Sequence, residues 1–249
     1  MCTLNAQVTW NTIDEGFEIG TYVSPKPSSI GNSTMTILRV DPKLYDFDIK
    51  HEYYGNTADV WSKKHNLLAV VNAGMYDRNG MNMGAMKNFD SIYNPKLNKD
   101  NAILAFNPKS KGLPLVDIID TKYVDAERLL KEYNSYTQSI RMVSLSGNNL
   151  WAPRNLMWSV LVVAMDKQGK VLFIHCRSPY PMHTFIDIVL QSPLNVRNMM
   201  YLEGGPEASL YVNNCGTELS LMGSYETNFF DDSNYHFWRI PNIIGITKK

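Results

Sequence analysis

The segment from Trp158 to His175, WSVLVVAMDKQGKVLFIH, contains two apolar runs separated by a short polar stretch. The runs 158–165 and 171–175 are rich in Val, Leu, Ile and aromatic residues, which are typical of buried strands. Between them lies Asp166-Lys167-Gln168-Gly169-Lys170, in which the glycine suits a tight turn. This segment predicts a β-hairpin, and the rest of the fold is interpreted around it.

Similar short runs bounded by Gly, Pro, Asn or Asp predict further strands. They are residues 17–23, 34–40, 67–72, 102–106, 115–119, 199–202 and 209–212. Capping residues and apolar faces predict three helices, at residues 57–65, 126–136 and 184–191. The stretch 79–99 has no clear period and is expected to form an ordered loop over a site. With no repeat or linker, we expect one domain over residues 1–249, of the α+β class, with mixed β-sheets and a few packed helices.

The composition excludes several classes of protein. The chain has 24 Lys and Arg residues and 24 Asp and Glu residues, so its net charge is zero. It lacks the excess and clustering of positive charge that are typical of nucleic-acid-binding domains. The longest apolar runs, 67–71 and 160–165, are far shorter than the ~20 residues that cross a bilayer. Abundant Asn, Tyr, Met and Trp favour a cleft for a polar neutral ligand such as a sugar.

The three cysteines, Cys2, Cys176 and Cys215, cannot form a disulfide framework and lack zinc-site spacing. A bridge between Cys176 and Cys215 stays open if the protein is exported. Residues 1–7 contain no intact signal peptide, so the chain is either cytosolic or begins with the remnant of a signal. We expect no cofactor and no metal, although an irregular calcium site near Asp77 stays open.

Two glycine-containing segments each follow directly on a predicted strand. They are Asn72-Ala73-Gly74-Met75-Tyr76 and Leu202-Glu203-Gly204-Gly205-Pro206-Glu207. A polar group at a strand end is held at the rim of the sheet, and glycines let a ligand approach the backbone closely. Either segment alone favours a tight turn with solvated polar residues, whereas the two together favour a site.

Four segments occur in an order that resembles the phosphodiester glycosidase family. They are Asn72–Tyr76, Thr137–Val143, the pair Arg154-Asn155, and Leu202–Gly205 with Ser209. The resemblance covers roughly residues 67–249. It implies an exported hydrolase, with the cytoplasm left open, that cleaves a glycosyl phosphodiester at the glycosidic C–O bond and releases a free sugar such as N-acetylglucosamine. The chain departs from the family at three positions. The family usually has Asp where this chain has Glu203, often Gly where it has Ala73, and commonly Ser where it has Glu207.

The resemblance also implies roles for particular residues. An oxocarbenium-like transition state needs a carboxylate as nucleophile or as base for water, and Glu203 is the first candidate. Arg154, and secondarily Arg177, would stabilise the departing phosphate. Asp77 and Glu207 are candidates for a second acid or base. The expected substrate-binding residues are Asn72, Gly74, Tyr76, Gln138, Asn155, His175, Arg177, Gly204, Gly205 and Ser209.

Two other functions stay open. One is a non-catalytic carbohydrate-binding or cell-envelope module on the same fold, which the departures at 203 and 207 favour. The other is a phosphodiesterase that cuts the P–O bond. In each case the expected partner is a small sugar phosphate or a glycan. Because the net charge is zero, an anionic substrate requires local positive charge, which we expect at Arg154 and Arg177.

Overall fold

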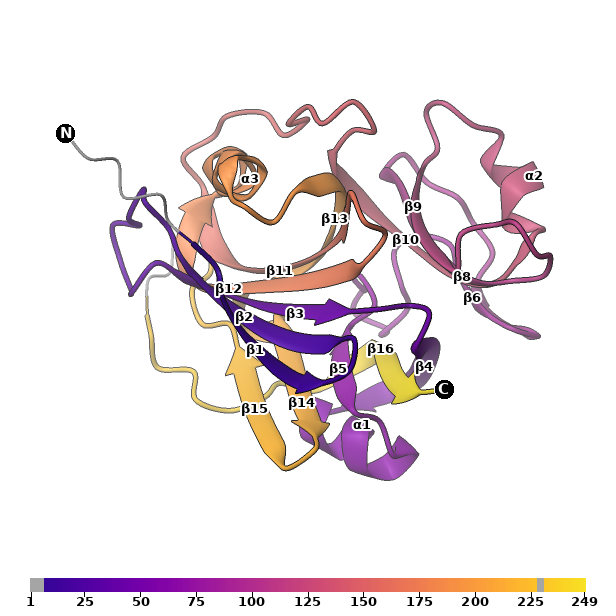
Figure 1. The fold of residues 1–249 in the computed structure, drawn as a ribbon, viewed down its shortest axis with the longest axis horizontal. Helices are drawn as coiled ribbons and strands as arrows, with labels where there is room; N and C mark the ends of the chain where they lie inside the picture. The colour runs from indigo at the N-terminus through magenta and orange to yellow at the C-terminus, as the bar shows by residue number, and fades with distance from the viewer. Residues whose placement is uncertain (1–6, 228–230) are drawn as a thin grey trace.

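A computed structural model describes residues 7–227 and 231–249 of the chain. The suggested signal remnant, residues 1–7, lies outside this part of the chain except for Gln7. Two β-sheets and three short α-helices make up the structure (Figure 1). The strands are β1 Thr9–Asp14, β2 Phe17–Val23, β3 Thr34–Val40, β4 Tyr45–Asn56, β5 Ala69–Asn72, β6 Met86–Asn88, β7 Ser91–Asn94, β8 Asn101–Pro108, β9 Val116–Asp120, β10 Tyr133–Val143, β11 Met157–Asp166, β12 Val171–Pro181, β13 Val196–Gly204, β14 Ser209–Asn214, β15 Thr217–Met222 and β16 Ile240–Lys248.

The fold class predicted from the sequence is wrong. The structure is 51% strand and 11% helix, so it is mostly β rather than α+β. The sheets are not mixed either, because every strand pair in the described part of the chain is antiparallel. The helical content was overestimated at residues 126–136: α2 is only Ala126–Leu130, and Tyr133 already begins β10.

The predicted hairpin is confirmed and lies at the centre of the larger sheet. β11 pairs with β12 on one side and with β13 on the other, in an eleven-stranded sheet. The main order of that sheet is β1-β2-β3-β12-β11-β13-β10-β6-β7, with β8 and β9 attached through β10. The second sheet has the order β15-β14-β5-β16-β4.

The two sheets pack face to face and share one apolar core. Leu161 and Phe173 from the large sheet belong to the same buried cluster as Val71, Leu210 and Ile244 from the second sheet. This burial of apolar side chains from both sheets is the main stabilising contribution to the fold.

Helices cover the two outer faces. α3, Met182–Gln191, packs Phe185 and Val189 against Val162 and Ile174 of the large sheet. α1, Ala58–His65, covers the second sheet with the fully buried Trp61 (Figure 1). Both helices were predicted, α3 from its apolar face and α1 from a capping hydroxyl at Thr57. The Thr57 hydroxyl donates to the Asp59 carboxylate and makes no capping hydrogen bond.

The stretch 79–99 is not wholly a loop, because it contains β6 and β7. These strands extend the large sheet beside β10 (Figure 1). Cys176 is buried and Cys215 is exposed, and both are free thiols.

Candidate functional site

The turn between β13 and β14 carries two glutamates. Glu203 stands near the end of β13, opposite Leu161 of β11, and Glu207 closes a single turn of 3-10 helix, Gly205–Glu207. Both side chains are partly buried. The second glycine segment therefore places two carboxyl groups at the rim of the large sheet, and the sequence named both as candidates for acid, base or nucleophile.

Asn72 and Ser209 stabilise this turn through hydrogen bonds to its backbone. The Asn72 carboxamide donates to the Glu207 carbonyl (3.1 Å) and accepts from the Ser209 amide (2.8 Å). The Ser209 hydroxyl also donates to the Glu207 carbonyl (2.8 Å). Because Asn72 and Ser209 are fully buried, they position Glu207 through its backbone rather than facing a ligand.

A pocket of about 360 Å³ opens beside the two glutamates. It is lined by Trp158, Tyr201, Gly204, Gly205, Glu207, Glu226 and Thr227. Glu203 is not one of its lining residues, but the next residue, Gly204, is. A Cβ at Gly204 would collide with the Tyr201 hydroxyl and the Trp158 indole, so only glycine fits between Glu203 and the pocket wall.

Aromatic side chains form one wall of this pocket. The Trp158 indole N–H donates to the Tyr201 hydroxyl (3.1 Å), and the Trp151 ring lies 5.8 Å from the Tyr201 ring, centroid to centroid. Aromatic faces beside carboxylates suit the apolar face of a sugar ring and its hydroxyls.

Burial and mutual repulsion favour the neutral forms of the carboxyl groups. Burial, together with the Glu207 charge, raises the pKa of Glu203 to about 8, despite a hydrogen bond from the Gly204 amide. Burial and the Glu226 charge raise the pKa of Glu207. The pKa of Tyr76 is also raised, by burial and by both glutamates, which places Tyr76 near them. Glu203 is therefore largely protonated at neutral pH.

The rest of the first glycine segment supports the backbone. Thr137 donates its hydroxyl to the Ala73 carbonyl (2.6 Å), and a Cβ at Gly74, where φ is +141°, would press on the Asn82 side chain. The buried Gln138 carboxamide accepts from the amides of Ala85 and Asn98 (3.2 and 3.0 Å). The hydrogen-bonding groups of Gln138 are thus used within the protein.

Asp77 is exposed and organises its own turn. Its carboxylate accepts from the backbone amides of Asn79 (2.8 Å) and Met81 (3.0 Å). No group of three or more His, Cys, Asp or Glu side chains within residues 7–227 and 231–249 is arranged to hold a metal ion.

Arg154 and Asn155 are exposed on the segment that connects Trp151 to Trp158. Both tryptophans contact Tyr201, so this segment passes the aromatic wall of the pocket. Arg154 is an exposed residue of this segment and is not one of the residues that line the glutamate pocket.

Arg177 and His175 lie in a different pocket, of about 420 Å³, with Thr34 and Tyr235. The Arg177 guanidinium donates to Asp232 (2.8 Å) and to the carbonyls of Met222 (2.9 Å) and Asn234 (2.8 Å). His175 is buried and its Nε2 donates to the Ala208 carbonyl (3.3 Å). The structure does not bring these two predicted residues into the glutamate pocket.

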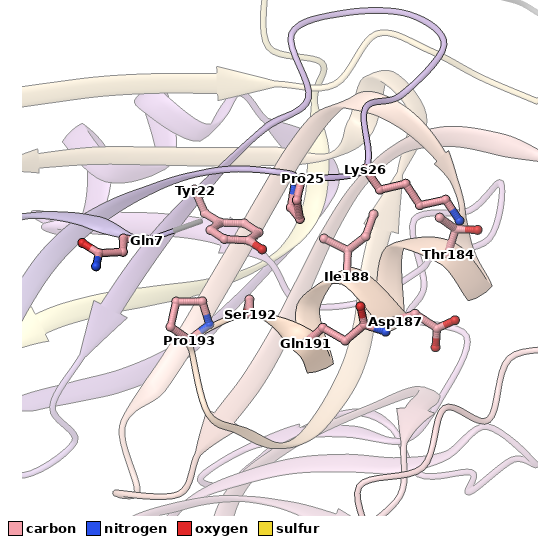
Figure 2. A pocket seen from close by; sticks show the side chains of 10 residues that line it. All are labelled: Gln7, Tyr22, Pro25, Lys26, Thr184, Asp187, Ile188, Gln191, Ser192 and Pro193. Carbon is pink, nitrogen blue, oxygen red and sulfur yellow. The ribbon is translucent and has the colours of Figure 1, made fainter. Parts of the chain in front are cut away.

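Pocket size does not identify the site. A hollow of about 570 Å³ between the end of β2 and α3, shown in Figure 2, is larger than the glutamate pocket. Its side chains include Tyr22, Lys26 and Asp187, and no predicted site residue lines it.

Sequence reasoning missed two contributors to the glutamate pocket. Tyr201 follows the apolar pattern of its strand, and nothing in the sequence shows that its hydroxyl would reach Trp158. Glu226 comes from a segment without a recognisable motif, and only the fold brings it next to Glu207. In the described part of the chain, no helix has the length and apolar character needed to cross a membrane.

Comparison with known proteins identifies the family of the chain. The sequence profile of the phosphodiester glycosidase family matches residues 65–247, which is most of the chain. The chain belongs to the phosphodiester glycosidase family. The resemblance that the sequence predicted is confirmed, and the matched range contains both glycine segments. No curated protein matches the sequence of this family member significantly.

Two solved structures are similar to this phosphodiester glycosidase family member. A hypothetical protein from Synechocystis aligns with a TM-score of 0.65 and 12% identity, over 97% of this chain and 64% of that protein. This chain thus spans less than two thirds of that protein. The catalytic domain of zebrafish N-acetylglucosamine-1-phosphodiester alpha-N-acetylglucosaminidase, auto-inhibited by its pro-peptide, aligns with a TM-score of 0.62 and 13% identity, over 98% of this chain and 83% of that domain. At these identities the two structures show a shared fold.

Proposed function

We propose that this protein hydrolyses a glycosyl phosphodiester at the glycosidic C–O bond. The observation that carries the proposal is the pair of partly buried glutamates, Glu203 and Glu207, at the rim of the sheet, with raised pKa values and an aromatic-walled pocket beside them. Glycoside hydrolysis typically uses two carboxyl groups in different protonation states.

The raised pKa of Glu203 changes the role that we propose for it. A carboxyl group with a pKa of about 8 is a general acid at neutral pH, so Glu203 donates its proton to the bridging oxygen as the sugar–oxygen bond breaks. Glu207, which lines the pocket, acts as the carboxylate that attacks the anomeric carbon or takes a proton from the attacking water. Overall, water adds its OH to the sugar and its proton to the phosphate monoester.

A protonated Glu203 also lowers the repulsion that a phosphodiester anion meets in a pocket containing Glu207 and Glu226. We propose that Arg154 contacts the phosphate, since its guanidinium is exposed on the segment that borders the aromatic wall. Tyr76 is proposed to contact the sugar. Asn72, Gln138 and Ser209 act as positioning residues, because their polar groups are engaged within the protein.

The sugar is proposed to be N-acetylglucosamine, the sugar in the name of the similar zebrafish enzyme. We further propose that residues 1–249 act as one domain, since both sheets contribute to one core, and that the protein works outside the cytoplasm. Detection of the native protein in the exported fraction of its source cells would test the last point.

The experiment is incubation of the purified protein with UDP-N-acetylglucosamine and with aryl glycosyl phosphates, followed by measurement of free sugar. Glu203→Gln removes the acid while keeping nearly the same size, and we expect kcat/KM to fall by about 10³-fold. The matched control is Glu15→Gln, which makes the same change at an exposed position. Full activity in Glu203→Gln, with its circular dichroism unchanged, would remove Glu203 from its role.

Hydrolysis in ¹⁸O-labelled water separates the alternatives. Label in the sugar identifies C–O cleavage, whereas label in the phosphate identifies a phosphodiesterase. Saturable sugar binding with no turnover on a broad panel would instead identify a non-catalytic carbohydrate-binding module.

A further inference from the structure

A groove of about 600 Å³ on the far side of the 75–85 hairpin gathers four lysines. Lys87 comes from β6, Lys96 follows β7, Lys109 follows β8 and Lys131 follows α2. Because four separate elements contribute one ammonium group each, the cluster is made by the tertiary structure rather than by a basic run in the sequence.

The four ammonium groups are available to a ligand. In residues 7–227 and 231–249, other lysines form the ion pairs with carboxylates, namely Lys50, Lys64, Lys170, Lys248 and Lys249. The groove also contains one carboxylate, Glu127, which leaves an excess of positive charge. The glutamate pocket, in contrast, contains no lysine or arginine among its lining residues.

Apolar and aromatic side chains line the same groove. Tyr136 of β10 and Leu130 of α2 are among them, and Ile92 and Leu97 remain exposed at 60% and 36%. Ammonium groups beside aromatic and aliphatic side chains fit a chain in which negative groups alternate with less polar units. A phosphate-bearing carbohydrate chain has this character, since sugar rings present C–H faces between the phosphates.

One hairpin connects this groove to the glutamate pocket. Tyr76, whose pKa responds to both glutamates, forms a β-bridge with Asn82, and the Met83 amide donates to the Met75 carbonyl (2.9 Å). Two residues farther along, Ala85 lines the groove. The segment 76–85 therefore runs from the surroundings of the glutamates to the lysine groove.

We propose that the groove formed by Lys87, Lys96, Lys109, Lys131 and Tyr136 binds a phosphodiester-linked carbohydrate chain. The choice of ligand rests on the proposed function, whereas the groove itself does not depend on it. The groove supplies the local positive charge that a protein of zero net charge needs for an anionic substrate. The sequence suggested such charge at Arg154 and Arg177, and neither of these arginines lines the groove.

The test is fluorescence anisotropy with a labelled oligosaccharide of N-acetylglucosamine units joined by phosphodiesters. Binding is measured on the Glu203→Gln protein, so that turnover does not consume the probe and failure of the proposed hydrolysis is scored separately. We expect saturable binding that weakens as salt rises, and at least about tenfold weaker binding when the four lysines are changed to Gln. The matched control changes four exposed lysines elsewhere, Lys43, Lys63, Lys122 and Lys167, to Gln and should shift the affinity by less than about twofold.

Three results would overturn the inference. One is an equal loss of affinity in the control variant, which would mean that total charge alone attracts the probe. Another is equal affinity for a phosphate-free chitin oligosaccharide of the same length. The third is tighter binding to single-stranded oligouridylate or to phosphatidylglycerol vesicles, which would assign the groove to nucleic acid or to a membrane surface. Hydrolysis without groove binding would leave the proposed function intact and remove only this inference.

Discussion

Glu203 and His175 occupy equivalent places on the two strands that flank β11. Both are opposite Leu161, one across the β11–β13 pair and the other across the β11–β12 pair. Burial pushes both groups to their neutral forms, raising the pKa of Glu203 to about 8 and lowering the pKa of His175 to about 4. Their neighbours differ, however. His175 donates to the Ala208 carbonyl, whereas Glu203 accepts only from the amide of the next residue and faces a second carboxyl group.

This difference separates a group that supports the fold from one that is free to react. A buried polar side chain whose hydrogen-bonding capacity is used by the backbone stabilises the local structure. A buried carboxyl group beside another carboxyl group, at the border of a pocket, retains a proton that it can transfer. Three predictions test this comparison.

The largest expected effect separates Glu207 from His175. We expect Glu207→Gln to lower kcat/KM by about 10²-fold or more, because Glu207 lines the pocket and supplies the carboxylate. We expect His175→Gln, which keeps an N–H donor for the Ala208 carbonyl, to change kcat/KM by less than about threefold. Steady-state kinetics on a glycosyl phosphodiester measures both. Loss of activity in His175→Gln as large as in Glu207→Gln would erase the distinction.

The second effect is an opposite pH dependence of stability. The folded pKa of Glu203 is above its ordinary value of 4.5, so its contribution to the free energy of unfolding is lost as pH rises from 4.5 to about 8. The folded pKa of His175 is below its ordinary value of 6.5, so its contribution is lost as pH falls from 6.5 to about 4. Urea denaturation across this pH range gives the free energy of unfolding as a function of pH. We expect Glu203→Gln to reduce its fall toward alkaline pH and His175→Gln to reduce its fall toward acid pH. A single variant that reduces the fall in both directions would contradict the assignment.

The smallest effect concerns Asn72, which holds the glutamate turn. Asn72→Ala leaves the buried Ser209 amide without its acceptor, and we expect the free energy of unfolding to fall by about 2 kcal/mol. Asn213→Ala, an exposed change on the same strand as Ser209, should alter it by less than about 0.5 kcal/mol. Urea denaturation of the two variants gives the comparison. An unchanged stability in Asn72→Ala would mean that the turn is held by other contacts.

Much of the fold could be predicted where a short stretch of sequence carries the pattern of a strand, turn or helix. The hairpin 158–175 was found because apolar runs and a glycine turn lie together in the sequence, and α3 because its apolar residues share one face. The strand Tyr45–Asn56 was missed, since much of it is polar or only half-buried and its partners come from distant segments. The same applies to Tyr133–Val143, part of which has the apolar spacing of a helix and becomes a strand by pairing with β6, β8 and β13.

The candidate site was predictable to a similar degree. The order of the motifs identified the glutamate turn, because strand ends and glycines are local features. It could not separate Arg177, whose donors are taken by Asp232, Met222 and Asn234, from Arg154, which stays exposed. The sequence shows which side chains can donate, but not which donors the fold has already used.

By itself, the sequence determined the central hairpin, the two glycine segments and the family to which the chain belongs, because these depend on residue types at short separations. Only the tertiary structure decided that both sheets are antiparallel, that Glu203 shares its surroundings with Glu207 rather than with Arg177, and that four distant lysines meet in one groove. These outcomes depend on strand register and on which faces are buried. Register and burial arise from contacts between residues far apart in the chain, so no local pattern encodes them.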